Sequence, residues 1–154
     1  MVLGELAQSC VEGASDARAD EVGMLLAERF VATASQASPV QPNLTTRDRK
    51  RAVDAAMWLE ERSHEDVDLA EVAAEIKLSP FHFLRLFRSS LGVTPHQYLV
   101  RSRLRNAARL LADEDRSISA IALDVGFMDL SNFVRTFHRA AGVSPRAFRK
   151  LSRG

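Results

Sequence analysis

Apolar side chains along this chain recur three or four residues apart, the spacing that places them on one face of an α-helix. Alternating apolar and polar segments bounded by tight-turn residues, which would indicate strands, are nearly absent. Amphipathic helices are predicted within residues 3–12 and 20–35, and a linker with two prolines follows at residues 38–45. We therefore expect an all-α protein with a helical extension over residues 1–37.

Capping residues mark where the helices after the linker begin and end. Serine, threonine and aspartate favour the position before a helix, and glycine favours the position after it. The predicted caps are Thr45 or Thr46, Asp68, Ser79, Ser117 and Asp129, with terminating glycines Gly92, Gly126 and Gly142. The predicted helices cover residues 47–62, 69–76, 80–91, 95–112, 118–125, 130–141 and 145–148.

Two parts of this helical region resemble each other. Residues 83–98 match residues 133–148 at an offset of 50, and both copies contain Phe-x-Arg-x-Phe followed by Gly-Val-(Thr/Ser)-Pro. The helices upstream match at an offset of 49, so the second copy has one extra residue in its turn, near Met128. Each copy is a helix, a short turn and a helix, the module whose second helix enters the major groove of DNA.

The predicted domain arrangement follows from this repeat. Residues 46–154 are expected to form a DNA-binding domain with one helix-turn-helix at 69–91 and another at 118–141. The helix at 95–112 joins them and would be about 27 Å long. If the two second helices lie about 34 Å apart, they reach successive major grooves. An all-helical repeat used for packing or protein contact is the alternative.

The outward faces of the second helices carry the candidate DNA contacts. Arginine can donate two hydrogen bonds to guanine, and apolar groups can contact the thymine methyl. On the first helix the predicted core is Phe83, Leu86, Phe87 and Leu91, and the outer stripe is Phe81, Leu84, Arg85 and Arg88. On the second helix the predicted core is Phe133, Phe137 and Ala140, and the outer face is Leu130, Ser131, Asn132, Val134, Arg135 and His138.

These candidate contacts have structural alternatives. Arg85 and Arg135 could bind phosphate or pair with a carboxylate, and Phe81 and Leu84 could be partly buried. Some of the four arginines on the connecting helix could also contact phosphate, and the others would be ordinary solvated charges. These four are Arg101, Arg103, Arg105 and Arg109.

The net charge of +1 is divided unevenly along the chain. Residues 1–45 have a net charge of −4, and residues 46–154 have 19 basic and 14 acidic side chains, a net charge of +5. From Lys77 onward the net charge reaches +9. A basic C-terminal half suggests a polyanionic partner, and double-stranded DNA fits the repeat. A solvated surface is the alternative explanation of the charge.

Several other classes of protein are disfavoured. No run of 18 apolar residues predicts a membrane span, and no basic start followed by an apolar stretch predicts a secretory signal. A single cysteine, Cys10, fits a reducing cytoplasm. The four histidines and this cysteine lack metal-ligand spacing, and no phosphate loop or nucleophile motif is found. We expect no catalytic residue, metal or cofactor, and a cytoplasmic, nucleoid-associated protein.

At the repeated Phe-x-Arg-x-Phe and Gly-Val-(Thr/Ser)-Pro motifs and the residues around them, the chain resembles the AraC/XylS family of transcription regulators, over about residues 47–150. The resemblance implies seven helices, forming two helix-turn-helix subdomains joined by a long helix, with both recognition helices in successive major grooves of an asymmetric site. It implies groove contacts at Phe81, Leu84, Arg85, Leu130, Ser131, Val134 and Arg135. His138 departs from the family, which usually has lysine or arginine there. The motifs are Leu69–Ala73, Leu78–Phe87, Gly92–Pro95, Val125–Phe127, Gly142–Pro145 and Phe148–Arg149.

The N-terminal part also departs from many relatives. Those relatives have a β-rich effector-binding domain ahead of this region, which 45 helical, acidic residues cannot form. Residues 3–37 are similar to the helix pair that mediates dimerisation in such relatives, so we expect a homodimer contact there. The chain is either a stand-alone regulator or the C-terminal part of a longer one, and we favour the second. RNA polymerase is an expected partner. The alternatives are an architectural DNA-binding protein with weak sequence selectivity and a helical protein-interaction module.

Overall fold

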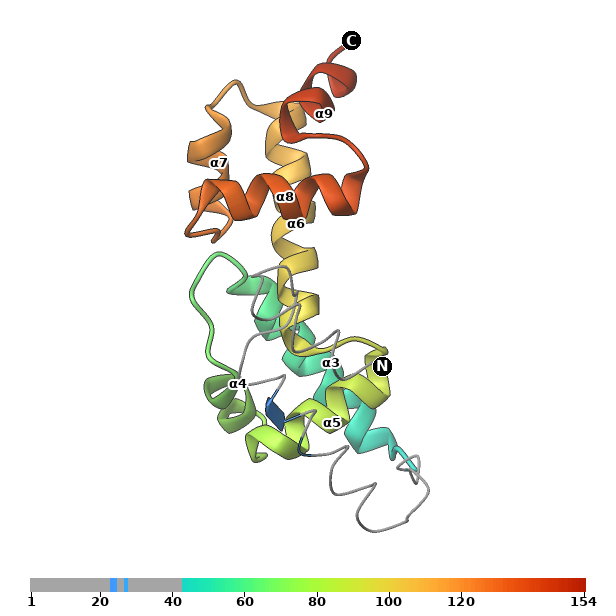
Figure 1. Cartoon of the computed structure of the whole chain (residues 1–154). Coiled ribbons are helices and arrows are strands. Elements are labelled where there is room, and N and C mark those ends of the chain that lie inside the picture. The colour runs from blue at the N-terminus through green and yellow to red at the C-terminus, as the bar shows by residue number, and fades with distance from the viewer. Residues whose placement is uncertain (1–22, 25–26, 28–42) are drawn as a thin grey trace. The chain divides into compact units, whose positions relative to one another are not determined.

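The structure is a computed structural model that describes residues 23–24, 27 and 43–154 (Figure 1). Its described part contains seven helices between residues 46 and 152 and no strand, which confirms the all-α class. The predicted extension over residues 1–37 lies almost entirely outside the described residues. The helices are α3 (Thr46–Glu61), α4 (Leu69–Glu75), α5 (Pro80–Leu91), α6 (Pro95–Asp113), α7 (Ile118–Asp124), α8 (Leu130–Ala141) and α9 (Pro145–Ser152).

The chain divides into two compact units, and each contains one helix-turn-helix. Unit 1 holds the described residues up to Leu59 together with Asp68–Tyr98, and therefore α4 and α5. Unit 2 holds Glu60–Val67 and Leu99–Gly154, and therefore α7, α8 and α9. Only the first turn of α6 belongs to unit 1, and the rest of α6 belongs to unit 2. The predicted domain boundaries at residues 38 and 46 stay predictions.

The helix starts follow the predicted caps. Thr45 caps α3 in a reciprocal arrangement: its backbone N–H donates to Asp48 Oδ2 at 3.0 Å, and the Asp48 N–H donates to Thr45 Oγ1 at 3.1 Å. The Thr45 hydroxyl also donates to Asp48 Oδ2 at 2.7 Å, and this bond, together with that from the Thr45 N–H, holds the pKa of the Asp48 carboxyl below its ordinary value of 3.8. Asp129 accepts from the backbone N–H groups of Ser131 and Asn132, at 3.1 and 2.9 Å. The serine and aspartate caps of α4, α5 and α7 are also present: Asp68, Ser79 and Ser117.

The sequence repeat is also a repeat of packing contacts. In unit 1 the rings of Phe87 and Tyr98 meet edge to face, with centroids 5.7 Å apart. In unit 2 their counterparts Phe137 and Phe148 meet in the same way at 5.4 Å. This contact holds the recognition helix of each unit against the first turn of the helix that follows it. In unit 2 the helix that follows is α9, which packs against α8 (Figure 1).

A left-handed residue turns the chain between the two helices of each helix-turn-helix. Lys77 has φ 57° in unit 1, and Gly126 has φ 98° at the matching position in unit 2. The residue after it donates a backbone hydrogen bond to the first helix and so closes the turn. These bonds join Leu78 N to Ala73 O and Phe127 N to Ala122 O, both at 2.9 Å. The sequence predicted Gly126 as a helix end, but it gave no indication of the left-handed backbone at Lys77.

Position 126 requires a residue without a side chain, whereas position 77 accommodates a lysine. A Cβ on Gly126 would lie 2.9 Å from Arg103 Nε, 2.9 Å from the carbonyl oxygen of His64 and 3.0 Å from that of Ser63. These atoms belong to the segment between α3 and α4 and to α6, both within unit 2. The Arg103 guanidinium donates to the carbonyls of Ser63 and Glu65, each at 2.6 Å. Glycine at this turn therefore lets a loop dock directly on the second helix-turn-helix.

The predicted core faces are partly wrong. On α3, the spacing of apolar residues predicts that Val53 and Met57 share a buried stripe with Ala52, Ala56 and Leu59, but Val53 and Met57 are exposed. On α8, Ala140 is exposed and Thr136 is buried in its place. Leu91, placed in the core of α5, is partly exposed. The buried residues of α3 are Ala52, Ala55, Ala56 and Leu59.

We predict that Gly126→Ala destabilises the protein more than Gly142→Ala. Both glycines have positive φ, but a Cβ on Gly142 meets nothing within 4 Å. Gly142→Ala should therefore cost only the left-handed conformation, about 1–2 kcal/mol. Gly126→Ala adds steric overlap, about 1–3 kcal/mol more. Urea unfolding followed by circular dichroism measures both, and equal losses would show that the loop contact is not tight.

We predict that Asp129→Ala lowers the free energy of unfolding by about 1 kcal/mol, because two backbone N–H groups at the start of α8 lose their acceptor. Asp129→Asn is the matched control, since asparagine caps about as well as aspartate. The same unfolding measurement applies. If the asparagine variant loses as much stability as the alanine variant, hydrogen bonding by the cap is not the cause.

Candidate nucleic-acid interface

Helix α8 brings together five of its six predicted contact residues. They line one open hollow of about 510 Å³ on the surface of unit 2. Since the cap at Asp129 fixes the first turn of α8, the position of this face relative to the turn is also fixed. The lining residues are Leu130, Ser131, Val134, Arg135 and His138. All five are exposed.

The sixth residue, Asn132, lies at the edge and holds Arg135. Its side-chain oxygen accepts from the Arg135 guanidinium and from the Thr136 hydroxyl, both at 3.3 Å. Thr136 is buried beside the core phenylalanines. Asn132 therefore connects the buried and exposed faces of α8 and restricts where the Arg135 side chain points. Direct contact of Asn132 with DNA stays a prediction.

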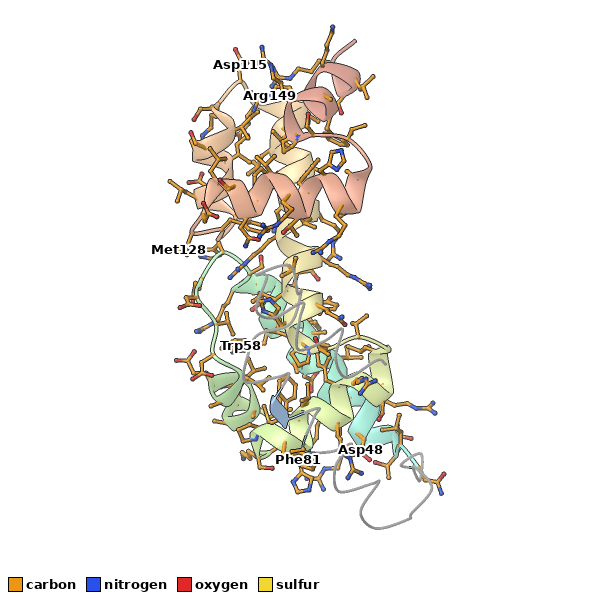
Figure 2. All side chains as sticks on the ribbon, in the orientation of Figure 1. Asp48, Trp58, Phe81, Asp115, Met128 and Arg149 are labelled. Carbon is orange, nitrogen blue, oxygen red and sulfur yellow. The ribbon has the colours of Figure 1, made fainter. Side chains whose placement is uncertain are left out.

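Helix α5 presents a different outer face. Phe81 stands at its first turn and is 36% exposed (Figure 2). Arg88 is exposed and Arg85 partly so. The cap Ser79 accepts the backbone N–H of His82, and its hydroxyl lies 2.9 Å from His82 Nδ1. The three predicted contacts Phe81, Arg85 and Arg88 are thus accessible on one helix.

The prediction that Leu84 contacts DNA is wrong. The sequence placed it on the outer stripe of α5, but only 2% of its surface is exposed. The buried face of α5 is formed by Phe83, Leu84 and Phe87, so Leu84 belongs to the core and cannot contact a groove in this arrangement. On α8 the buried face is formed by residues 133, 136 and 137 instead. The two recognition helices therefore bury different faces, which the aligned sequences do not reveal.

Two arginines of α6 have structural partners. Arg103 donates to two backbone carbonyls of the segment between α3 and α4. Arg105 lies 3.0 Å from the carboxylate of Glu60. Sequence reasoning left open which of the four α6 arginines contact phosphate. The hydrogen bonds assign Arg103 to the internal structure of unit 2.

The C-terminal basic residues also make internal contacts that sequence reasoning missed. Arg149 donates to the Arg116 carbonyl at 2.7 Å, and Arg153 donates to the carbonyls of Ala112 and Glu114 near the end of α6. Arg116 in turn pairs with Asp124 at 2.5 Å, and this carboxylate raises the pKa of the guanidinium. Much of the positive charge counted from the sequence therefore stabilises unit 2. A feature of the sequence that could have predicted these contacts is the basic C-terminus, because the last carbonyl groups of a long helix such as α6 need hydrogen-bond donors.

Among the described residues, no helix combines the length and the apolar character needed to cross a bilayer. Figure 2 shows polar side chains distributed over every helix of the described part.

The chain matches known regulators in sequence. The sequence profile of a helix-turn-helix domain family matches residues 72–151. The melibiose operon regulatory protein of Escherichia coli (strain K12) is 32% identical over 142 residues, which are 86% of this chain and 46% of that protein. The transcriptional activator RhaS of Klebsiella pneumoniae (strain 342) is 38% identical over 93 residues, 60% of this chain and 34% of RhaS. The chain thus spans about half the length, or less, of these relatives.

Solved structures agree with the sequence matches. An AraC-type transcriptional regulator from Chromobacterium violaceum is 27% identical with a TM-score of 0.64, and the match covers 67% of this chain and 92% of that one. The DNA-binding domain of AdpA, solved in complex with a target DNA, is 34% identical with a TM-score of 0.62, covering 65% and 90%. Since the profile match alone covers more than half of the residues, the chain belongs to the AraC/XylS family of helix-turn-helix transcription regulators.

Proposed function

We propose that the chain regulates transcription by binding promoter DNA sequence-specifically, with α5 and α8 in successive major grooves. The observation that carries the proposal is the outer face of α8, where Arg135 and His138 lie beside Leu130 and Val134 around one open hollow. Arginine can bind the phosphates or guanine, and apolar groups can contact thymine. AdpA, a neighbour in fold, was solved with its target DNA, which supports the same use of this domain.

The two helices should contact different base sequences. Phe81, Arg85 and Arg88 are accessible on α5, whereas α8 presents Ser131, Val134, Arg135 and His138. A single chain would therefore bind an asymmetric site without a palindrome. Selection of bound sequences from random duplexes at two salt concentrations tests this. It should enrich a site of about two helical turns, preferred over random DNA by about 10³ or more.

The sign of regulation is proposed from the relatives. RhaS is by its name a transcriptional activator. We propose activation for this chain as well, with RNA polymerase as its partner and the nucleoid as its location. Transcription in vitro from a promoter with the selected site, with and without the protein, distinguishes an activator from a repressor.

Architectural, sequence-tolerant binding is the second candidate, because the net charge of +9 from Lys77 onward attracts any duplex. We predict that Arg85→Ala and Arg135→Ala each weaken the selected site by about 1–3 kcal/mol and relax preference at one base position. The control Arg109→Ala removes an exposed charge of α6 and should weaken all duplexes alike. Fluorescence anisotropy on selected and scrambled duplexes measures both. Uniform weakening by all three variants would instead support the architectural function.

A third candidate is a helical protein-interaction module formed by residues 3–37, which lie almost entirely outside the described residues. We predict that deletion of residues 1–40 lowers self-association but leaves a folded DNA-binding protein. Analytical ultracentrifugation gives the oligomeric state, and circular dichroism with anisotropy gives folding and binding. A truncated chain that unfolds would contradict the division at the linker.

A further inference from the structure

Helix α8 exposes two aliphatic side chains that its own packing does not need. Leu130 is 45% exposed and Val134 is 36% exposed, and they lie four residues apart on one face. The core of α8 is already formed by Phe133, Thr136 and Phe137, all buried. Polar side chains at both positions would leave this core intact, so stability alone does not account for the pair.

The exposure of this pair is specific to the second unit. Val134 corresponds in the repeat to Leu84, which is buried to 2% on α5. The first residue of α5, at the position of Leu130, is Pro80. The helix-turn-helix architecture therefore does not by itself place aliphatic groups at these two outer positions.

The surroundings of the pair indicate what covers it. Leu130 and Val134 line the same hollow as Arg135, His138 and Ser131. An occupant must therefore be anionic or rich in acceptors and must also present small apolar groups. On the base edges of the major groove the one apolar group is the C5 methyl of thymine. Guanine offers the two acceptors that an arginine can bind.

We propose that Leu130 and Val134 contact thymine methyl groups, so that the half-site bound by unit 2 contains thymines next to a guanine bound by Arg135. This inference rests on the proposed function. Residues four apart on a helix have Cβ atoms about 5–6 Å apart, and stacked bases rise about 3.4 Å. The two methyl groups should therefore lie one or two base steps apart. Arg135 lines the same hollow as Leu130 and Val134, and its guanidinium donates to the Asn132 side-chain oxygen at 3.3 Å.

Replacement of thymine by deoxyuridine tests the contact directly, since it removes only the methyl group and leaves the hydrogen-bonding edge unchanged. Each thymine of the selected site is replaced in turn, and the Kd of the full chain is measured by anisotropy. Two replacements should weaken binding about fourfold each, the loss expected when one buried methyl group is removed. In Leu130→Ala and Val134→Ala, replacing the corresponding thymine by deoxyuridine should leave the Kd of that variant nearly unchanged.

Leu123→Ala is the matched control variant. Leu123 lies on α7 in the same unit, is 62% exposed and does not line the hollow. This variant should bind the selected site and its deoxyuridine-substituted versions as the wild type does, with the full fourfold loss at each of the two thymines. Circular dichroism and binding to random DNA at low salt show that every variant remains folded, which is expected because both aliphatic side chains are already partly in solvent.

The outcomes separate this inference from the proposed function. Absence of any preferred sequence would overturn the proposed function itself. A specific site that tolerates uracil at every position would overturn only the thymine contact. A uracil effect of equal size in the wild type and in both alanine variants would also overturn it, because the methyl would then act through DNA shape. Asn132→Ala should weaken the preference for guanine but leave both uracil losses unchanged.

Discussion

The hydrogen bond that closes each helix-turn-helix turn is the constraint on which the rest of the structure depends. It joins the residue after the left-handed position to the first helix, at 2.9 Å in both units. Because the next helix begins within two or three residues and is capped at once, this bond fixes the direction in which α5 and α8 leave the turn. Phe83 and Phe87 of α5 and Phe133 and Phe137 of α8 reach the core, and the opposite face of each helix stays in solvent.

Two different residue types adopt the left-handed backbone conformation at the matching positions of the two turns. Lys77 accepts a left-handed φ in unit 1, where a side chain is tolerated at a cost of about 1–2 kcal/mol. Gly126 is required in unit 2, because backbone carbonyls and Arg103 lie where its Cβ would be. The extra residue of the second turn, Met128, is 88% exposed and follows this contact. The requirement for glycine in the second copy therefore follows from the docked loop.

Arginine has two separate uses in this chain. Arg103, Arg149 and Arg153 donate to backbone carbonyls and join segments that are far apart in sequence. Hydrogen bonds from a charged donor of this kind contribute more than neutral ones, about 1.5–3 kcal/mol each. Arg85 and Arg135 instead lie on the recognition helices, where Arg135 donates to the side-chain oxygen of Asn132 on the same helix. Net charge by itself does not separate these uses, which differ in the acceptors each arginine finds.

The sequence by itself determined the helices, their caps and the repeat, because hydrogen bonds of caps and the periodicity of apolar residues are local. It also identified five residues of α8 that the structure brings into one hollow. Tertiary structure alone decided that Leu84 is buried, that Val53 and Met57 are exposed and that Arg103 is internal. These outcomes depend on which element packs against each helix face, and a helical pattern allows several rotations of that face. The sequence predicted two recognition helices with different outer residues, and packing also made their buried faces different.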